Sequence, residues 1–439
     1  MMRTLESKNK GFERELLAIL TRRGAETAGV EEAVREIIEG VRAKGDEALI
    51  HYTRQFDGVD IALGELEIPR EEWRRAQKTM EKETLSALQR AAERIESFHR
   101  RQLRPSWFDT EGGVVRGQVV RPMDRAGVYV PGGKAAYPSS LLMNVIPAKV
   151  AGVREVVVLT PPSPDGINPS VLAAAHLVGA DRVLRVGGAQ AVAALAYGTQ
   201  SVPRADIIVG PGNAYVTAAK RLLYGVVMVD MVAGPSEILV LADGSTPPAF
   251  VAADLLSQAE HDEQAWPILI TPSAAFAQQV AEEVGKMMET LPRREIIRAC
   301  LECRGLIIVV RDVAEGVGIA NRIAPEHLEL ALKDPLRWLG EVENAGAVFL
   351  GPYTPEAVGD YLGGPNHVLP TGGTARFFSP LGVEHFLKRT NILSFSQDAL
   401  DEVREDVARL ARLEGFEAHA RSVEVRRKED GSDGTKGKG

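Results

Sequence analysis

Short apolar runs rich in valine and isoleucine alternate with alanine- and leucine-rich segments from about residue 114 onward. This alternation is typical of βαβ units, in which each helix returns the chain to the next strand of a parallel sheet. In a first unit we predict strands at 127–130, 155–159, 182–186, 206–209 and 226–229, and helices at 139–151, 169–179, 189–197 and 214–224. In a second unit we predict strands at 238–241, 268–270, 306–310, 328–330 and 347–350, and helices at 248–264, 274–289, 295–303 and 355–360. Two α/β units predict a cleft at the carboxyl ends of their strands.

The segments outside these units have helical periodicity. Residues 1–20 are expected to form an N-terminal arm, and residues 381–425 a helical C-terminal segment. Residues 426–439, rich in Lys, Gly and Asp, are predicted to be a disordered tail. The predicted fold class is therefore α/β, with two Rossmann-like parallel sheets and flanking helices.

The composition fits an enzyme of small molecules better than a nucleic-acid or membrane protein. With 45% hydrophobic and 26% charged residues among 439, the chain is typical of a soluble globular protein of two or three domains. A net charge of −8, with basic residues interleaved among acids, argues against nucleic-acid binding. No apolar run approaches the roughly 18 to 20 residues of a membrane span. The first residues lack the apolar core of a secretory signal, so we expect a cytoplasmic protein.

Gln258 and His261 stand three residues apart near the end of a predicted helix. That spacing places an amide oxygen and an imidazole on one helical face, which is half of a metal site if an acid and another histidine come from elsewhere. On this spacing alone, a solvated polar face is the simpler interpretation.

Three glycine turns follow predicted strands of the first unit, at 130–134, 186–190 and 209–213. Glycine lets the backbone approach a phosphate, and the next helix offers free N–H groups, so three such turns favour a nucleotide. None has the G-x-G-x-x-G pattern. The alternative is that any α/β sheet needs tight turns here.

Further candidate residues lie in the second half of the chain. Glu326 and His327 open a predicted strand, and a carboxylate beside an imidazole suits proton transfer near neutral pH. Asp360 begins a glycine- and proline-rich loop that is expected to shape a ligand site, and His419 lies in the helical tail. Gln258, His261, Asp360 and His419 would make an N/O ligand set acceptable to Zn²⁺ or Mn²⁺.

The cysteines, Cys300 and Cys303, form a C-x-x-C pair at the end of a predicted helix. A redox pair would instead open a helix, and no second pair completes a zinc knuckle. We expect both thiols to be structural.

Taken together, seven motifs resemble the histidinol dehydrogenase family. They are GVYVPGGKAAYPSS (127–140), VGPGN (209–213), GPSE (234–237), SQAEHD (257–262), PEHL (325–328), the loop 360–376 and EGFEAH (414–419). The resemblance runs in order across nearly the whole chain. It implies a zinc-dependent oxidation of L-histidinol through L-histidinal to L-histidine with two NAD, the last steps of histidine biosynthesis.

The resemblance also implies roles for single residues and domains. It assigns Zn²⁺ to Gln258, His261, Asp360 and His419, acid–base work to Glu326 and His327, substrate contacts to Ser236, Glu414, His327 and the metal ligands, and NAD contacts to Tyr129, Gln190 and Asn213. It implies an NAD-binding domain at 126–235 and a metal and substrate domain built from 21–125 with 236–380. It further implies a homodimer in which Glu414 and His419 complete the neighbouring chain's site.

Two other functions stay open on the sequence. A related metal-dependent dehydrogenase could oxidise another small polar alcohol, such as a sulfonated diol, although a carboxylate like Glu414 favours a cationic amine and repels a sulfonate. A metal-dependent hydrolase would need no cofactor, and the glycine turns argue against it.

Overall fold

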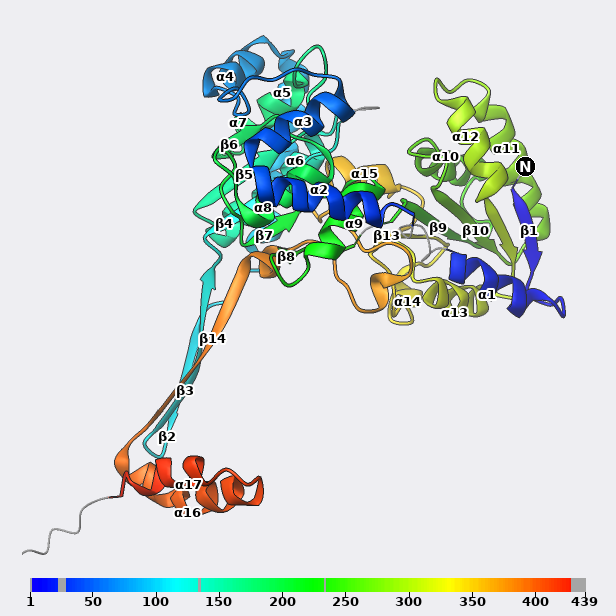
Figure 1. The fold of residues 1–439 in the computed structure, drawn as a ribbon. Coiled ribbons are helices and arrows are strands. Elements are labelled where there is room, and N and C mark those ends of the chain that lie inside the picture. The colour runs from blue at the N-terminus through cyan, green and yellow to red at the C-terminus, as the bar shows by residue number, and fades with distance from the viewer. Residues whose placement is uncertain (1, 23–28, 133–135, 233, 428–439) are drawn as a thin grey trace, which may run out of the picture. The chain divides into compact units, whose positions relative to one another are not determined.

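The computed structural model describes residues 2–22, 29–132, 136–232 and 234–427, and its helices and strands are drawn in Figure 1. Contacts divide the chain into two compact units. The first holds residues 1–103 and 123–386, and the second holds 104–122 and 387–439. Among the described residues, no helix has the length and apolar character needed to cross a membrane. Gly133, Lys134 and most of the expected tail, 428–439, lie outside the described residues.

One sheet of the first unit has five parallel strands in the order β6-β5-β4-β7-β8. Its strands are β4 (Arg125–Tyr129), β5 (Glu155–Leu159), β6 (Arg182–Leu184), β7 (Ile207–Val209) and β8 (Met228–Val229). Its crossover helices are α6 (Pro138–Ala151), α7 (Pro169–Leu177), α8 (Gly188–Tyr197) and α9 (Ala214–Leu223). The order 3-2-1-4-5 is that of a Rossmann half, with its switch point between β4 and β7.

The other sheet has six parallel strands in the order β1-β11-β10-β9-β12-β13. Its strands are β1 (Arg3–Glu6), β9 (Glu237–Ala242), β10 (Trp266–Thr271), β11 (Leu306–Val309), β12 (His327–Ala331) and β13 (Ala347–Leu350). Its helices are α1 (Phe12–Arg22), α10 (Pro248–Ala259), α11 (Ala274–Met288), α12 (Arg294–Cys303), α13 (Val313–Ile323), α14 (Leu336–Leu339) and α15 (Glu356–Tyr361). Without β1, the same 3-2-1-4-5 order recurs. The predicted α/β class with parallel sheets is confirmed.

Side chains alternate between the two faces of the six-stranded sheet, as strand geometry requires. Leu239 and Leu241 face α1 and α13, whereas Ile238 and Val240 face α10, α11 and α12. Figure 1 shows these helices on the two sides of the sheet. Both faces are covered, which explains why the strands read as continuous apolar runs rather than alternating ones.

The N-terminal segment differs from the expected arm. β1 joins the edge of the six-stranded sheet beside β11, and Leu5, Phe12 and Leu16 are buried in its core. A four-residue strand is too short to recognise from periodicity, so only the pairing with β11 identifies it.

The helices that follow pack on the five-stranded sheet, not on the six-stranded one as the expected grouping of 21–125 with 236–380 implied. They are α2 (Glu31–Lys44), α3 (Asp46–Asp57), α4 (Arg70–Thr79) and α5 (Lys82–Arg100). α2 contacts α8, α4 contacts α7, and α5 contacts α6. An amphipathic pattern shows which face of a helix is buried but not which sheet buries it.

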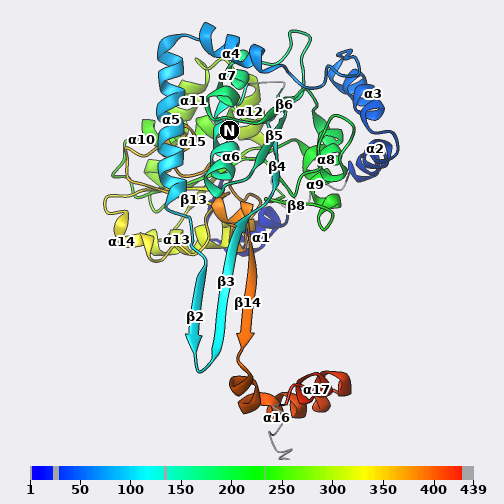
Figure 2. The same cartoon turned by 90° about the vertical axis from the view of Figure 1, so that its left-hand side faces the viewer.

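The second unit is a three-stranded antiparallel sheet followed by two helices, and Figure 2 shows its strands side by side. It contains β2 (Trp107–Glu111), β3 (Val114–Pro122), β14 (Leu387–Phe395), α16 (Gln397–Leu413) and α17 (Glu417–Glu424). β14 pairs with β3 along its whole length, from Leu387 opposite Pro122 to Phe395 opposite Val114. The prediction of a wholly helical segment from 381 is therefore wrong for β14, because a partner far away in the sequence imposes the strand.

Candidate active site

The candidate acid–base residues lie at the amino ends of two neighbouring parallel strands. Ser236 precedes β9, Glu326 precedes β12, and His327 opens β12 opposite Ile238. The expected location at the carboxyl ends of this sheet is therefore wrong. The crossover helix α10 runs from the carboxyl end of β9 to the amino end of β10, so it delivers its last turn to this same edge.

Glu326 and Glu237 are linked by two reciprocal contacts. The backbone N–H of Glu237 donates to Oε2 of Glu326 at 2.8 Å, and the N–H of Glu326 donates to Oε2 of Glu237 at 3.3 Å. Oε1 of Glu237 also accepts from the N–H of Gly372 at 3.0 Å, which ties the following loop to the site. Burial raises the pKa of Glu326 well above its ordinary value, while the Glu237 N–H partly stabilises its carboxylate.

His327 is buried between these acids and the short helix α15. Its Nδ1 lies 2.8 Å from the backbone oxygen of Glu237, and its Nε2 lies 3.8 Å from Oε1 of Glu356. Burial is the main cause that lowers the pKa of His327, to about 4, although the charge of Asp360 opposes it. The imidazole is therefore neutral at neutral pH.

Glu356 and Asp360 stand four residues apart on α15 and face His327. One ligand atom each of His327, Glu356 and Asp360 lies within 4.8 Å of the others. Burial and then the charge of Asp360 raise the pKa of Glu356 to about 9. Burial alone would raise the pKa of Asp360, but His367, whose Nδ1 lies 3.4 Å from Oδ1 of Asp360, holds it below its ordinary value. At neutral pH the carboxyl of Glu356 is thus protonated and neutral, whereas that of Asp360 is ionised.

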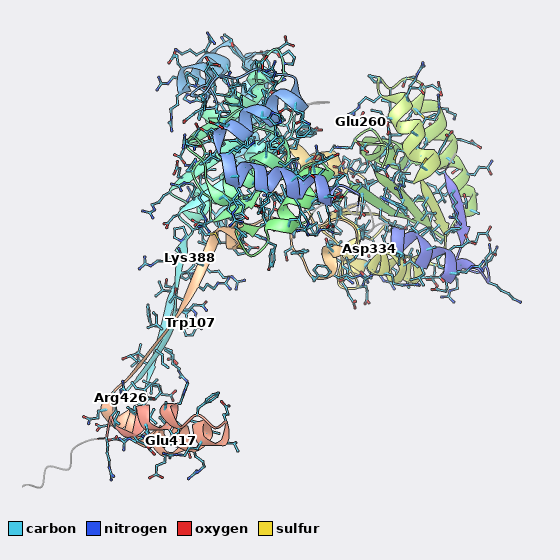
Figure 3. The ribbon with its side chains drawn as sticks, in the orientation of Figure 1. Trp107, Glu260, Asp334, Lys388, Glu417 and Arg426 are labelled. Carbon is cyan, nitrogen blue, oxygen red and sulfur yellow. The ribbon has the colours of Figure 1, made fainter. Side chains whose placement is uncertain are left out.

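Gln258 and His261 lie at the end of α10 near the same site. The helix ends at Ala259, with Glu260 (labelled in Figure 3) as its C-cap, so the predicted helix to residue 264 is too long. Gln258 is only 1% exposed, whereas His261 lies in the turn beyond the helix and is exposed. The charge of His261 is among the smaller causes that lower the pKa of His327. The hydroxyl of Ser257 contacts Oε2 of Glu356 at 3.3 Å, which connects α10 to α15.

Three buried atoms of this cluster have no hydrogen-bond partner in the described parts of the chain: Oε1 of Gln258, Nε2 of His327 and Oε1 of Glu356. Leaving buried polar atoms without partners costs free energy, and each such atom needs an explanation. Oxygen and imidazole donors of this kind are ligands that Zn²⁺ or Mn²⁺ accepts. The residues therefore fit a divalent metal.

The candidate NAD residues lie at the carboxyl edge of the five-stranded sheet. The hydroxyl of Tyr129 accepts from the N–H of Gly188 at 3.1 Å, in the first turn of α8. Both amide atoms of Gln190, which is 1% exposed, lack a partner among the described residues. Asn213 caps α9, since its Oδ1 accepts from the N–H groups of Tyr215 and Val216 at 3.1 Å. The unpaired Gln190 amide beside a helix N-terminus fits a polar ligand such as a dinucleotide.

The glycines of these turns also have packing roles. A side-chain carbon on Gly210, whose φ is +108°, would lie 2.1 Å from the backbone oxygen of Tyr129. Oδ2 of the buried Asp230 accepts from the Gly210 N–H at 2.8 Å, and Lys220, paired with Asp230 at 2.7 Å, donates to the Gly210 oxygen. The alternative that tight packing requires these glycines therefore holds for Gly210, whatever binds at the turn.

Glu414 and His419 belong to the second unit. Glu414 is the C-cap of α16 and His419 lies on α17, and both side chains are exposed. The ring of His419 lies 5.2 Å from that of Phe416. Among the described residues, the first unit by itself brings together Gln258, His261, Glu326, His327 and Asp360.

Glu356, Glu237 and His367 are absent from the sequence prediction. Glu356 could have been found, because it precedes Asp360 by four residues and so shares its helical face. Glu237 follows Ser236 directly but reads as the first residue of an apolar strand. Cys300, on the buried face of α12, lies in the core as expected of a structural thiol, whereas Cys303 is exposed.

Comparisons with known proteins identify the family that this chain resembles. Residues 20–427 match the family model described as histidinol dehydrogenase. The chain is 54% identical over 430 residues to histidinol dehydrogenase of Syntrophotalea carbinolica, covering 98% of this chain and all of that one. It is 53% identical over 427 residues to that of Nitrosomonas europaea, covering 97% and 99%. A crystal structure of histidinol dehydrogenase from Elizabethkingia anophelis matches with a TM-score of 0.91 and 35% identity, covering 97% of this chain and 98% of that one.

Proposed function

Since the chain belongs to the histidinol dehydrogenase family, we propose that it oxidises L-histidinol through L-histidinal to L-histidine with two NAD. The observation that carries this proposal is the family match over residues 20–427, which includes every residue of the buried cluster around His327. The product places the enzyme at the last steps of histidine biosynthesis. A cytoplasmic location remains a prediction from the sequence.

We propose that Gln258, His261 and Asp360 hold a Zn²⁺ ion together with His419 from a second copy of the chain. The unpartnered Oε1 of Gln258 supports this ligand set. When bound, a divalent metal would fix the amino alcohol by chelation, and its charge would favour the ionised forms of nearby carboxyls. His327 and Glu356 present further unpartnered atoms to the same space, so they are available to the substrate.

The two half-reactions divide the proton work between neighbouring residues. For the alcohol, the neutral His327 takes the hydroxyl proton on Nε2, because its Nδ1 faces the Glu237 oxygen. The aldehyde must then be hydrated before a second oxidation. Glu326 activates the water for that step once it is ionised. His327, after it has released its first proton to solvent, takes a proton from the hydrate. Ser236, at the start of β9, and Glu414 are the proposed contacts to the substrate, and the Glu414 carboxylate suits its amine.

Tyr129, Gln190 and Asn213 are the proposed NAD contacts, and NAD supplies the hydride acceptor of both oxidations. Their position supports this assignment, because all three lie at the carboxyl edge of the Rossmann-like sheet. Tyr129 ends β4, Gln190 lies in the first turn of α8 after β6, and Asn213 caps α9 after β7. The Gln190 amide can pair with the dinucleotide through one donor and one acceptor. The buried Tyr129 keeps its proton, since burial raises its pKa to about 12.

We further propose a homodimer with sites shared between the chains. The second unit supports this, because its helices bury only Ala408, Ala411 and Ala420 against one another. Leu410, Leu413 and Phe416 are 60%, 81% and 52% exposed, and Trp107, labelled in Figure 3, is 53% exposed. Exposed apolar surface of this extent is typical of an interface.

The deciding experiment measures absorbance at 340 nm with the zinc-loaded full chain, L-histidinol and NAD. We expect two NADH per histidinol consumed and histidine as the product. The same assay with a sulfonated diol in place of histidinol tests the related dehydrogenase. If a protein that demonstrably holds zinc forms no NADH from histidinol, the proposed function is wrong.

A further inference from the structure

Asp57 is a half-buried carboxylate that no part of the proposed reaction uses. It is the last residue of α3, and its Oδ2 has no hydrogen-bond partner in the described ranges. Burial raises the pKa of Asp57 to about 6. A buried carboxylate oxygen without a partner among the described residues is suited to a ligand that donates hydrogen bonds.

The fold brings Asp57 to the carboxyl edge of the five-stranded sheet. α3 packs against α8, and Gly58 ends the helix with a φ of +68°. The chain then returns along β6, where the N–H of Arg185 donates to the Leu66 oxygen at 2.9 Å. Asp46, at the start of α3, accepts from the hydroxyl of Thr199 at 2.5 Å, just beyond the end of α8. α3 therefore runs back along α8, and Asp57, its last residue, lies toward the first turn of α8. Tyr129 in turn contacts the first turn of α8, which carries the unpartnered Gln190.

The usual acid of a dinucleotide site is missing from this sheet. In Rossmann-like domains, a carboxylate near the end of the second strand binds the ribose hydroxyls of the adenosine half. The second strand here is β5, and it is followed by Thr160-Pro161-Pro162. Pro161 fills the space between turns, since a side-chain carbon on Gly187 would lie 2.4 Å from its Cβ. β5 lies between β4, which ends at Tyr129, and β6, so Asp57 approaches the edge where that acid is expected.

We propose that Asp57 accepts a hydrogen bond from the 2′-hydroxyl of the adenosine ribose and thereby selects NAD over NADP. The assignment rests on the proposed NAD dependence and adds a specificity residue to it. A 2′-phosphate would bring negative charge against this carboxylate and remove the donated hydrogen bond. The N-terminal helices, which are outside the Rossmann-like sheet, would then supply the residue that this sheet lacks.

The test is a calorimetric titration of the zinc-loaded full chain with NAD, with NADP and with NAD that lacks the 2′-hydroxyl. In Asp57→Asn we expect about tenfold weaker NAD binding, because the charged acceptor of this hydrogen bond becomes a neutral amide oxygen. NADP binding should stay equal or become tighter, so the ratio of NAD affinity to NADP affinity should fall at least about tenfold. The two proteins should bind the 2′-deoxy compound alike. Asp60→Asn is the matched control, since Asp60 is exposed and pairs with Arg54 at 3.1 Å, and it should change nothing.

Equal losses toward NAD and NADP in Asp57→Asn, or the same effect in Asp60→Asn, would overturn the assignment. If Asp57→Asn does not fold, the wild-type protein still decides, because it must bind 2′-deoxy-NAD about tenfold more weakly than NAD. Equal wild-type affinity for both compounds contradicts the proposal. If the wild type binds neither NAD nor NADP, the proposed NAD dependence itself is wrong. The 340 nm assay tests that dependence independently of Asp57.

Discussion

Nδ1 of His327 lies 2.8 Å from the backbone oxygen of Glu237, and this contact decides which ring nitrogen can act on a substrate. A backbone oxygen only accepts, so Nδ1 carries the hydrogen and Nε2 keeps its lone pair. Nε2 has no partner in the described parts of the chain. The first residue of β12 is thus a neutral base with its free nitrogen toward Glu356 and Asp360.

Replacing His327 with Asn should remove this base and leave the cofactor site intact. We expect kcat to fall by about 10²- to 10⁴-fold, the usual contribution of a positioned base, with unchanged NAD affinity. Steady-state rates and calorimetric NAD binding measure the two effects. A variant that keeps more than a tenth of the wild-type kcat would contradict the role of His327.

Glu356→Gln tests whether the acid absent from the sequence prediction supports the metal. Its Oε1 is unpartnered and belongs to the group with His327 and Asp360. We expect metal affinity to fall about 10- to 100-fold, as is typical when a supporting carboxylate is lost. Metal content after dialysis against graded chelator gives the affinity, and Glu341→Gln, at an exposed position, is the control. Unchanged metal retention would assign Glu356 to the substrate alone.

Mixing two inactive variants tests the proposed shared sites. His261→Ala and His419→Ala would each damage every site of their own homodimers. After subunit exchange, a mixed dimer would hold one intact site, so activity should recover to about a quarter of wild type for random pairing in a twofold dimer. No recovery, once mass spectrometry has verified the exchange, would mean that each chain builds its own site.

Two glycines with similar backbone angles should respond differently to alanine. Gly210 and Gly225 have φ values of +108° and +95°, but a new Cβ meets the Tyr129 oxygen at Gly210 and nothing within 4 Å at Gly225. Gly225→Ala should lower the free energy of unfolding by about 1 to 2 kcal/mol, the conformational cost alone. Gly210→Ala should lower the free energy of unfolding by clearly more, because the backbone of Tyr129 or of residue 210 must move to make room for the new Cβ. Urea unfolding measures both, and equal losses would show that the Gly210 turn relaxes freely.

The two thiols should differ in reactivity and should both be dispensable for turnover. Burial raises the pKa of Cys300 to about 12, so at pH 8 its reactive thiolate is on the order of one molecule in ten thousand. Iodoacetamide should therefore label only the exposed Cys303 in the native protein, and both thiols after unfolding. The double serine variant should keep most of its NADH production. Selective loss of the aldehyde step would instead indicate a thiohemiacetal on cysteine.

Much of the fold follows from local patterns in the sequence. The sequence predicts the strand at 155–159 and the helices near 139–151 and 189–197 to within about a residue. The strand is a short β-branched run and the helices are longer runs, so length and composition separate the two. The structure also brings Gln258, Glu326, His327 and Asp360 together in one unit, while their metal and acid–base roles stay predictions. Their motifs were long enough to indicate the family before any geometry was known.

Only the tertiary structure decided how those segments combine. Pairing with β3 makes Leu387–Phe395 a strand, and packing on α6, α7 and α8 assigns the N-terminal helices to the five-stranded sheet. The acid–base residues lie at the amino ends of β9 and β12, and α10 returns the chain to this same edge of the sheet. Glu237 and Glu356 complete the cluster there. The sequence by itself determined most strands and helices of the two parallel sheets and the motifs that indicate the family, since these depend on neighbouring residues. Strand partners, buried carboxyl contacts and unpartnered atoms arise between residues far apart in the chain, so they depend on the packed fold.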